Sequence, residues 1–218
     1  NCCCAHVGWN GAKGRKPEMT SNFLFDFVTL FAIINPFGLS FVFLNRTMSL
    51  SEAERAVVAR QIAIYAFCVL VVSMFAGSAI LGFFGVSLPA LRIAGGLVVA
   101  VSGWSLLNES SEDEDRKATS TQGLEAVRRM AFFPLTVPLT TGPGTIAVAI
   151  TLGARHNLME AKITPELVAV LAVAAIAGTI FHAYAHVSRM ARLFGVEGTR
   201  VIMRLSAFLL LCIGVQII

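Results

Sequence analysis

Six stretches of mostly apolar residues, each close to 20 residues long, make up most of this 218-residue chain. A helix of about 20 residues is long enough to cross the roughly 30 Å hydrocarbon core of a bilayer. With 56% hydrophobic and only 14% charged residues, the chain lacks the polar surface of an ordinary soluble domain. We therefore predict an all-α, polytopic membrane protein with six transmembrane helices. These helices are predicted over residues 23–44, 62–85, 88–107, 130–153, 167–187 and 201–218.

The basic residues in the loops predict how the chain is oriented. Loops that stay in the cytoplasm carry an excess of Lys and Arg. The first, third and fifth loops hold more basic residues than the leading segment and the other two loops together. We therefore expect these three loops in the cytoplasm and both termini on the outer side. Because the basic residues are spread over short loops, no nucleic-acid partner is expected.

Two of the apolar stretches contain a proline near their middles, Pro36 in the first and Pro143 in the fourth. Proline removes a backbone hydrogen bond and clashes with the turn before it, so each motif predicts a helix that stops and restarts. Each restart leaves unpaired N–H groups and the positive end of a helix dipole, which suit an anion such as a carboxylate. We predict that a solute binds between the two broken helices, with an ordinary proline kink as the alternative interpretation. The predicted binding residues are Asn35, Pro36, Phe37, Gly38, Thr140, Thr141, Gly142, Pro143, Gly144 and Thr145. Two further prolines, Pro134 and Pro138, predict an irregular first half of the fourth stretch.

The two broken stretches lie about half the chain apart, and each opens a block of three predicted spans. Leu91-Arg92-Ile93-Ala94 begins the third span much as Met203-Arg204-Leu205-Ser206 begins the sixth. Since three is odd, the second block would enter the membrane upside down. We predict two inverted three-helix repeats with broken first and fourth helices, as in several secondary transporters. The predicted parts are a non-native or disordered leader over 1–18, a first repeat over 19–107, an acidic cytoplasmic linker over 108–129 and a second repeat over 130–218.

Three ionisable residues in or beside the spans are candidates for ion coupling: Asp26, His182 and His186. Asp26 lies one turn inside the first span, where contact with headgroups or helix capping is an alternative role. His182 and His186 are four residues apart on one helix face, but their span supplies no third ligand, so we expect no metal site. The alternative is an interfacial or interhelical hydrogen-bonding cluster near the cytoplasmic end of this span, with Tyr184 close by. We expect no cofactor beyond Na⁺ or H⁺ as the coupling ion.

Three motifs together resemble those of the MarC family: Phe31–Gly38, Leu91–Gly96 and Phe133–Ile146. The likeness runs from Met19 to the end of the chain. Members are six-span proteins of the bacterial inner membrane, and some are described as transporters of small neutral amino acids such as glycine and alanine. The resemblance therefore implies a multi-pass inner-membrane protein that transports a small solute, with the binding site on the broken-helix motifs.

These observations predict a secondary transporter whose partners are the lipid bilayer and a small solute, with a homo-oligomer left open. The alternative is a non-transporting inner-membrane protein of the MarC family with a scaffold or stress role. An enzyme is not expected, because the chain has neither a Gly-x-Ser-x-Gly nor a His-Glu-x-x-His motif.

Overall fold

The computed structural model of the chain describes residues 19–108, 124–155 and 163–218. Within these ranges every regular element is helical, so the all-α prediction is confirmed. The predicted leader and most of the predicted linker lie outside the described residues. The elements are α1 (Met19–Ile34), α2 (Pro36–Arg46), α3 (Glu52–Phe83), α4 (Leu88–Asn108), α6 (Leu124–Arg129), η1 (Ala131–Thr140), α7 (Pro143–Arg155), α8 (Ile163–Ala185) and α9 (Val187–Ile217).

Among the described residues, five helical stretches are long and apolar enough to cross a membrane. The prediction of a polytopic membrane protein is therefore confirmed. The predicted span over 130–153 is not among the five, because it is divided between η1 and α7, which have 10 and 13 residues. The count of six spans stays a prediction. The five stretches are Thr20–Arg46, Glu52–Phe83, Leu88–Asn108, Glu166–Ala185 and Glu197–Ile217.

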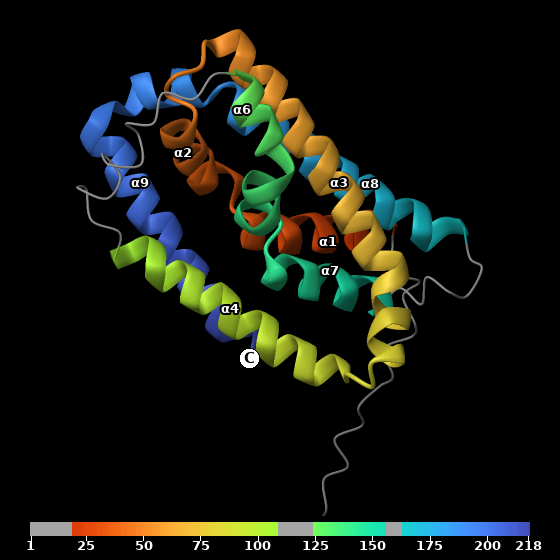
Figure 1. The fold of residues 1–218 in the computed structure, drawn as a ribbon. Helices are drawn as coiled ribbons and strands as arrows, with labels where there is room; N and C mark the ends of the chain where they lie inside the picture. Colours follow the sequence, from red (N-terminus) through yellow and green to blue (C-terminus); the bar gives the residue numbers. More distant parts are fainter. Residues whose placement is uncertain (1–18, 109–123, 156–162) are drawn as a thin grey trace, which may run out of the picture.

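Two pairs of long helices frame the fold (Figure 1). The helices α4 and α9 run side by side, as do α3 and α8, and the broken helices α1–α2 and η1–α7 lie between these pairs. Glycines allow the first pair to approach closely. A Cβ added to Gly103 would lie 2.5 Å from the backbone nitrogen of Leu211, and one added to Gly214 would lie 2.3 Å from that of Ala100. The backbones therefore touch directly, as small residues allow in membrane helices.

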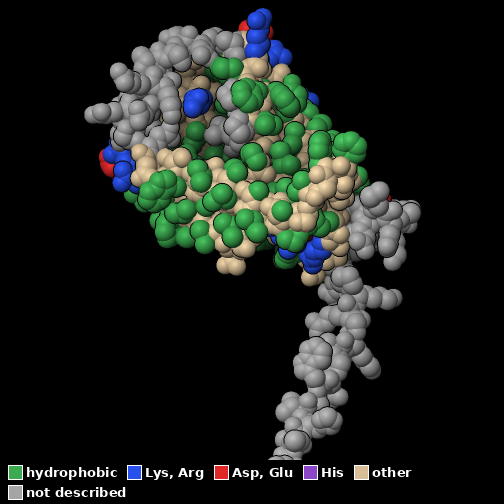
Figure 2. Space-filling view, turned by 60° about the horizontal axis from the view of Figure 1, so that its bottom comes forward, with side chains coloured by type: hydrophobic (Ala, Val, Ile, Leu, Met, Phe, Trp, Pro, Cys, Tyr) green, Lys and Arg blue, Asp and Glu red, His purple; other side chains and the backbone are tan. Residues whose placement is uncertain are grey.

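The exterior of the bundle is largely apolar. Figure 2 shows hydrophobic side chains over most of one face, basic side chains near its edges, and a hollow with a basic side chain inside it. Large hydrophobic residues such as Val72, Leu97 and Leu209 are more than half exposed. Polar side chains, among them Asp26 and Thr140, are buried inside the bundle. This distribution suits a protein surrounded by lipid rather than by water.

The turn between α2 and α3 is held in place by polar contacts. The Ser51 hydroxyl accepts a hydrogen bond from the backbone N–H of Glu54, whose carboxylate accepts one from the N–H of Ser51, so α3 starts with a capping box. The buried Arg55 donates to the carbonyl oxygens of Thr47 and Leu50, at 2.9 and 3.0 Å, and to the hydroxyl of Ser188. These bonds fasten the end of α2 to the start of α9.

Candidate functional site

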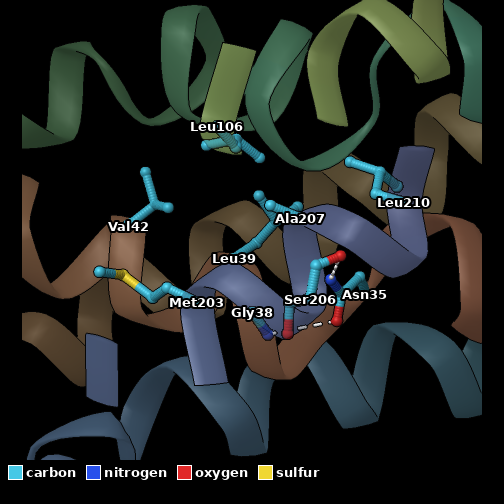
Figure 3. Close-up of a pocket in the computed structure, with 9 residues that line it drawn as sticks. All are labelled: Asn35, Gly38, Leu39, Val42, Leu106, Met203, Ser206, Ala207 and Leu210. Carbon is cyan, nitrogen blue, oxygen red and sulfur yellow. Dashed lines mark hydrogen bonds between the residues drawn. The ribbon is translucent and has the colours of Figure 1, made fainter. Parts of the chain in front are cut away.

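The first helix break lies at Asn35, between α1 and α2. Its backbone is left-handed, with φ 45° and ψ 60°, a conformation that Asn adopts more readily than most residues. Its side-chain oxygen accepts a hydrogen bond from the Gly38 N–H at 3.3 Å, while its amide nitrogen donates to the carbonyl of Ser206 at 3.3 Å. Figure 3 shows both bonds. Pro36 follows as the first residue of α2, so the helix stops and restarts as the motif predicts.

This first helix start is closed by the protein itself. A Cβ added to Gly38 would lie 2.5 Å from the Cβ of Ser206, so α2 packs directly on α9. The pocket beside Asn35 and Gly38 has a volume of about 20 Å³, enough for one water molecule. Pro36 is buried, and Phe37 is exposed with its ring against the edge of Phe31. The start of α2 therefore has no room for a solute in this conformation.

The segment before the second break is irregular, as its prolines predict. Phe133 and Val137 have extended backbones, with φ −130° and −114°, and each precedes a proline, which disfavours helical geometry in the residue before it. Threonine hydroxyls bond to backbone carbonyls within this segment. Thr136 donates to the carbonyl of Ala131 at 2.6 Å, and Thr140 donates to that of Leu135 at 2.8 Å.

The second helix start, at the beginning of α7, is open. Ile146 is the first residue whose N–H bonds back into the break, to the carbonyl of Gly142 at 3.0 Å. The N–H groups of Gly144 and Thr145 have no acceptor among the described residues. Unlike the start of α2, the start of α7 has no side-chain cap in this part of the chain. Two backbone donors and the positive end of the α7 dipole are therefore available to a ligand.

The hydroxyl of Thr145 is also available. Thr145 is 5% exposed and makes no side-chain hydrogen bond with the described residues. A helical threonine usually donates to the carbonyl four residues earlier, but Thr145 lacks this bond because Thr141 lies in the break. Among the described residues, the helical threonines that do make this bond are Thr29, Thr151, Thr179 and Thr199.

A cavity of about 880 Å³ lies against the start of α7. This volume falls in the range of about 300–1,000 Å³ that is typical of small-molecule sites. Besides the α7 residues, the wall consists of one face of α2, the second half of α4 and parts of α1, η1 and α9. The lining residues from α4 with polar side chains are Ser102, Ser105 and Asn108, and the apolar ones include Val98, Val101 and Trp104.

The structure brings together half of the predicted binding residues. Thr140, Gly142, Pro143, Gly144 and Thr145 line this cavity. Asn35 and Gly38 line the separate small pocket, and Pro36, Phe37 and Thr141 line neither space. The two spaces share wall residues, which are Leu39, Val42, Leu106 and Leu210. The two helix starts thus lie on neighbouring spaces rather than on one pocket.

Sequence reasoning placed Tyr184 near the histidine pair but missed its contact with the second break, which it supports from α8. Its side chain is fully buried, its hydroxyl lies 3.0 Å from the Thr140 hydroxyl, and its ring stacks on Phe43 with centroids 4.7 Å apart. A buried tyrosine hydroxyl needs a hydrogen-bond partner, so a tyrosine in an apolar span signals a buried polar contact. Tyr184 therefore connects α8, α2 and the end of η1.

We expect Tyr184→Phe to destabilise the protein by about 1 kcal/mol, because it removes the bond to Thr140 but keeps the ring stack. The midpoint of thermal unfolding of the purified protein measures this loss. Tyr65→Phe is the matched control, since the Tyr65 ring contacts Phe132 and no hydrogen bond of its hydroxyl is found in the described residues. Equal midpoints for the two variants would contradict a supporting role for the Tyr184 hydroxyl.

The three ion-coupling candidates lie away from the cavity. Asp26 is fully buried, with its Oδ1 4.0 Å from Nη1 of Arg155. The Arg155 guanidinium also lies 4.1 Å from the ring centroid of Phe25, so this contact ties α1 to the end of α7.

His182 and His186 are exposed and their rings stack, with centroids 5.9 Å apart. Among the described residues, no group of three His, Cys, Asp or Glu side chains could hold a metal ion.

The similarity to known proteins extends over nearly all of the residues that the structure describes. Residues 20–218 match the family model of "MarC family integral membrane protein". The chain is 33% identical over 199 residues to the inner membrane protein MarC of Salmonella typhimurium, with 88% of this chain and 89% of the relative covered. It is 34% identical over 201 residues to the MarC proteins of Escherichia coli strain UTI89 and Citrobacter koseri, with the same coverage. No solved structure matches. Because the family model spans the helical bundle and both helix breaks, the chain belongs to the MarC family of integral membrane proteins.

Proposed function

We propose that this protein is a secondary transporter of small neutral amino acids such as glycine or alanine, bound in the cavity at the start of α7. The observation that carries the proposal is the set of unpaired donors on the cavity wall. The N–H groups of Gly144 and Thr145 and the Thr145 hydroxyl have no protein partner among the described residues. Buried donors of this kind are costly unless a ligand or water accepts from them.

A substrate carboxylate satisfies these donors. Backbone N–H groups at a helix start and the positive end of its dipole favour a negative charge. The ammonium group of the same amino acid can donate to neutral oxygens on the wall, such as those of Thr140, Ser102 and Ser105. At Gly144 the place of a side chain is filled by Val99 of α4, so this glycine lets α4 pack directly against the helix start.

The packing of the helices supports an inverted repeat with six spans, in which η1 and α7 form the fourth. If α1–α2, α3 and α4 correspond to η1–α7, α8 and α9, the most extensive contacts between these helices have counterparts. The helix α2 packs on α9 as α7 packs on α4, and α2 packs on α8 as α7 packs on α3. Exchanging the two halves maps α3 onto α8 and α4 onto α9. The α3–α8 and α4–α9 contacts are therefore each mapped onto themselves. Such a repeat gives alternating access by rocking one half against the other.

The orientation we propose puts both termini outside and the cavity open toward the cytoplasm. The cavity extends to Arg46 and Asn108, at the ends of α2 and α4, which join the first and third loops. These loops are rich in basic residues, as cytoplasmic loops are. The Asp26–Arg155 contact would then lie near the outer side. We propose that transport is coupled to Na⁺ or H⁺, and we propose no catalytic role.

The test is counterflow of radiolabelled glycine and alanine in proteoliposomes, with and without gradients of Na⁺ and of pH. We expect uptake above that of empty liposomes for at least one of the two amino acids, and stimulation by one gradient. A protein with only a scaffold role would give no counterflow for either solute under any gradient, and that result would rule out the proposal.

A further inference from the structure

The cavity has one charged residue in its wall, and that residue is basic. Arg46, in the last turn of α2, is the only Asp, Glu, Lys or Arg among the described residues that line the cavity. Its guanidinium makes no ion pair and no hydrogen bond with any described residue. Its charge is therefore not neutralised by the part of the protein that the structure describes.

Arg46 extends from a fixed turn. The next residue, Thr47, is fully buried, and its hydroxyl donates to the carbonyl of Phe43 at 2.8 Å. Arg55 donates in turn to the Thr47 hydroxyl at 3.1 Å and to its carbonyl at 2.9 Å. Because this network holds the end of α2, the backbone of Arg46 is fixed at the cavity while its long side chain stays exposed.

The cavity thus has positive potential from two separate sources. One is the uncapped start of α7, with the unpaired Thr145 hydroxyl beside it, and the other is the Arg46 side chain. No carboxylate among the described lining residues offsets either of these two sources of positive potential. A cleft lined by charge of one sign, with apolar walls, concentrates ligands of the opposite sign and repels those of the same sign.

We propose that Arg46 is the residue that selects solutes bearing a carboxylate and rejects cations at the mouth of this cavity. This inference rests on the proposed transport function and assigns it a specificity-determining residue. Arg46 attracts the carboxylate of an entering solute, which then moves on to the N–H groups at the start of α7. Among the described lining residues, an ammonium compound without a carboxylate meets two positive groups and no negative one.

The test is equilibrium binding of radiolabelled glycine to the purified protein, with acetate and glycinamide as unlabelled competitors. Acetate has only the carboxylate of glycine, and glycinamide has only its ammonium charge. In wild-type protein we expect acetate to compete and glycinamide to compete weakly. In Arg46→Gln we expect the affinity for glycine to fall about threefold to tenfold at low salt, since an exposed charge acts mainly through its field. At high salt this difference should shrink, because salt screens such a charge.

Further variants separate charge from shape and from folding. Arg46→Lys keeps the charge and should retain most of the affinity, whereas Arg46→Glu should make glycinamide the better competitor. Arg60→Gln is the matched control, because Arg60 is also an exposed arginine but lies in a groove between α3 and α8 instead of this cavity. We expect it to bind glycine as the wild type does.

Three outcomes would overturn the proposal. If Arg46→Gln and Arg46→Glu bind glycine like the wild type at low salt, Arg46 does not select the ligand, although the transport function stands. If the wild-type protein binds glycinamide more tightly than acetate, the cavity does not select carboxylates. Absence of any glycine binding to the wild type, together with absence of counterflow, would overturn both the selection by Arg46 and the proposed function.

Discussion

Replacing Thr145 by Val is expected to lower the affinity for glycine or alanine about tenfold to a hundredfold while leaving the fold intact. Valine has nearly the shape of threonine but lacks the hydroxyl. That hydroxyl lies on the cavity wall and makes no hydrogen bond inside the described protein. A hydrogen bond to a charged group contributes about 1.5–3 kcal/mol, which corresponds to this range of affinities. Binding of the radiolabelled amino acid measures the loss, and circular dichroism checks the fold.

Thr151→Val is the control on the same helix. The Thr151 hydroxyl donates to the carbonyl of Ala147 at 3.0 Å and does not line the cavity. This variant should bind glycine normally. Unchanged binding in Thr145→Val would show that the Thr145 hydroxyl does not contact the ligand and would remove the main support for placing the carboxylate at the start of α7.

Replacing Gly153 by Ala is expected to destabilise the protein by about 1–3 kcal/mol, as overpacking of a tight interior does. A Cβ at this position would lie 2.0 Å from the carbonyl oxygen of Met74 and 2.7 Å from its carbonyl carbon. These are backbone atoms of α3, so no side chain can rotate away, and α7 would have to move off α3. The midpoint of thermal unfolding of the purified protein measures the effect.

Gly178→Ala is the matched control, because it makes the same chemical change where there is space for a side chain. A Cβ on this residue of α8 would have no atom of a neighbouring element within 4 Å. Alanine is favoured over glycine in a helix by about 1 kcal/mol, so this variant should be as stable as the wild type or more stable. A Gly153→Ala protein that unfolds at the same temperature as Gly178→Ala would contradict the close contact of α3 and α7.

The position of α7 matters for the site as well as for stability. Gly153 sets the end of α7 against α3, while Gly144 sets its start against α4, where an added Cβ would lie 2.0 Å from Cγ2 of Val99. Both ends of α7 are thus fixed by contacts that allow no side chain. We attribute the precise placement of the open helix start on the cavity to these two contacts.

The sequence by itself determined the features that depend on neighbouring residues. The lengths of the apolar stretches predict the helices, because a helix must satisfy its own backbone groups in lipid. Pro36 and Pro143 mark the two restarts, and the extended backbones of Phe133 and Val137 follow from the prolines next to them. Each of these effects acts within about one helical turn, so it can be derived from the sequence.

Only the tertiary structure decided which helix start is open. The two motifs look equivalent in the sequence, yet Asn35 caps the start of α2 and also bonds to Ser206, 171 residues away, while the start of α7 faces the cavity. The placement of Arg46 on that cavity and the bond between Tyr184 and Thr140 depend in the same way on helices distant in the chain. The physical reason is that packing between remote helices determines whether a polar group finds a protein partner, and neither spacing nor composition encodes which remote residue that partner is.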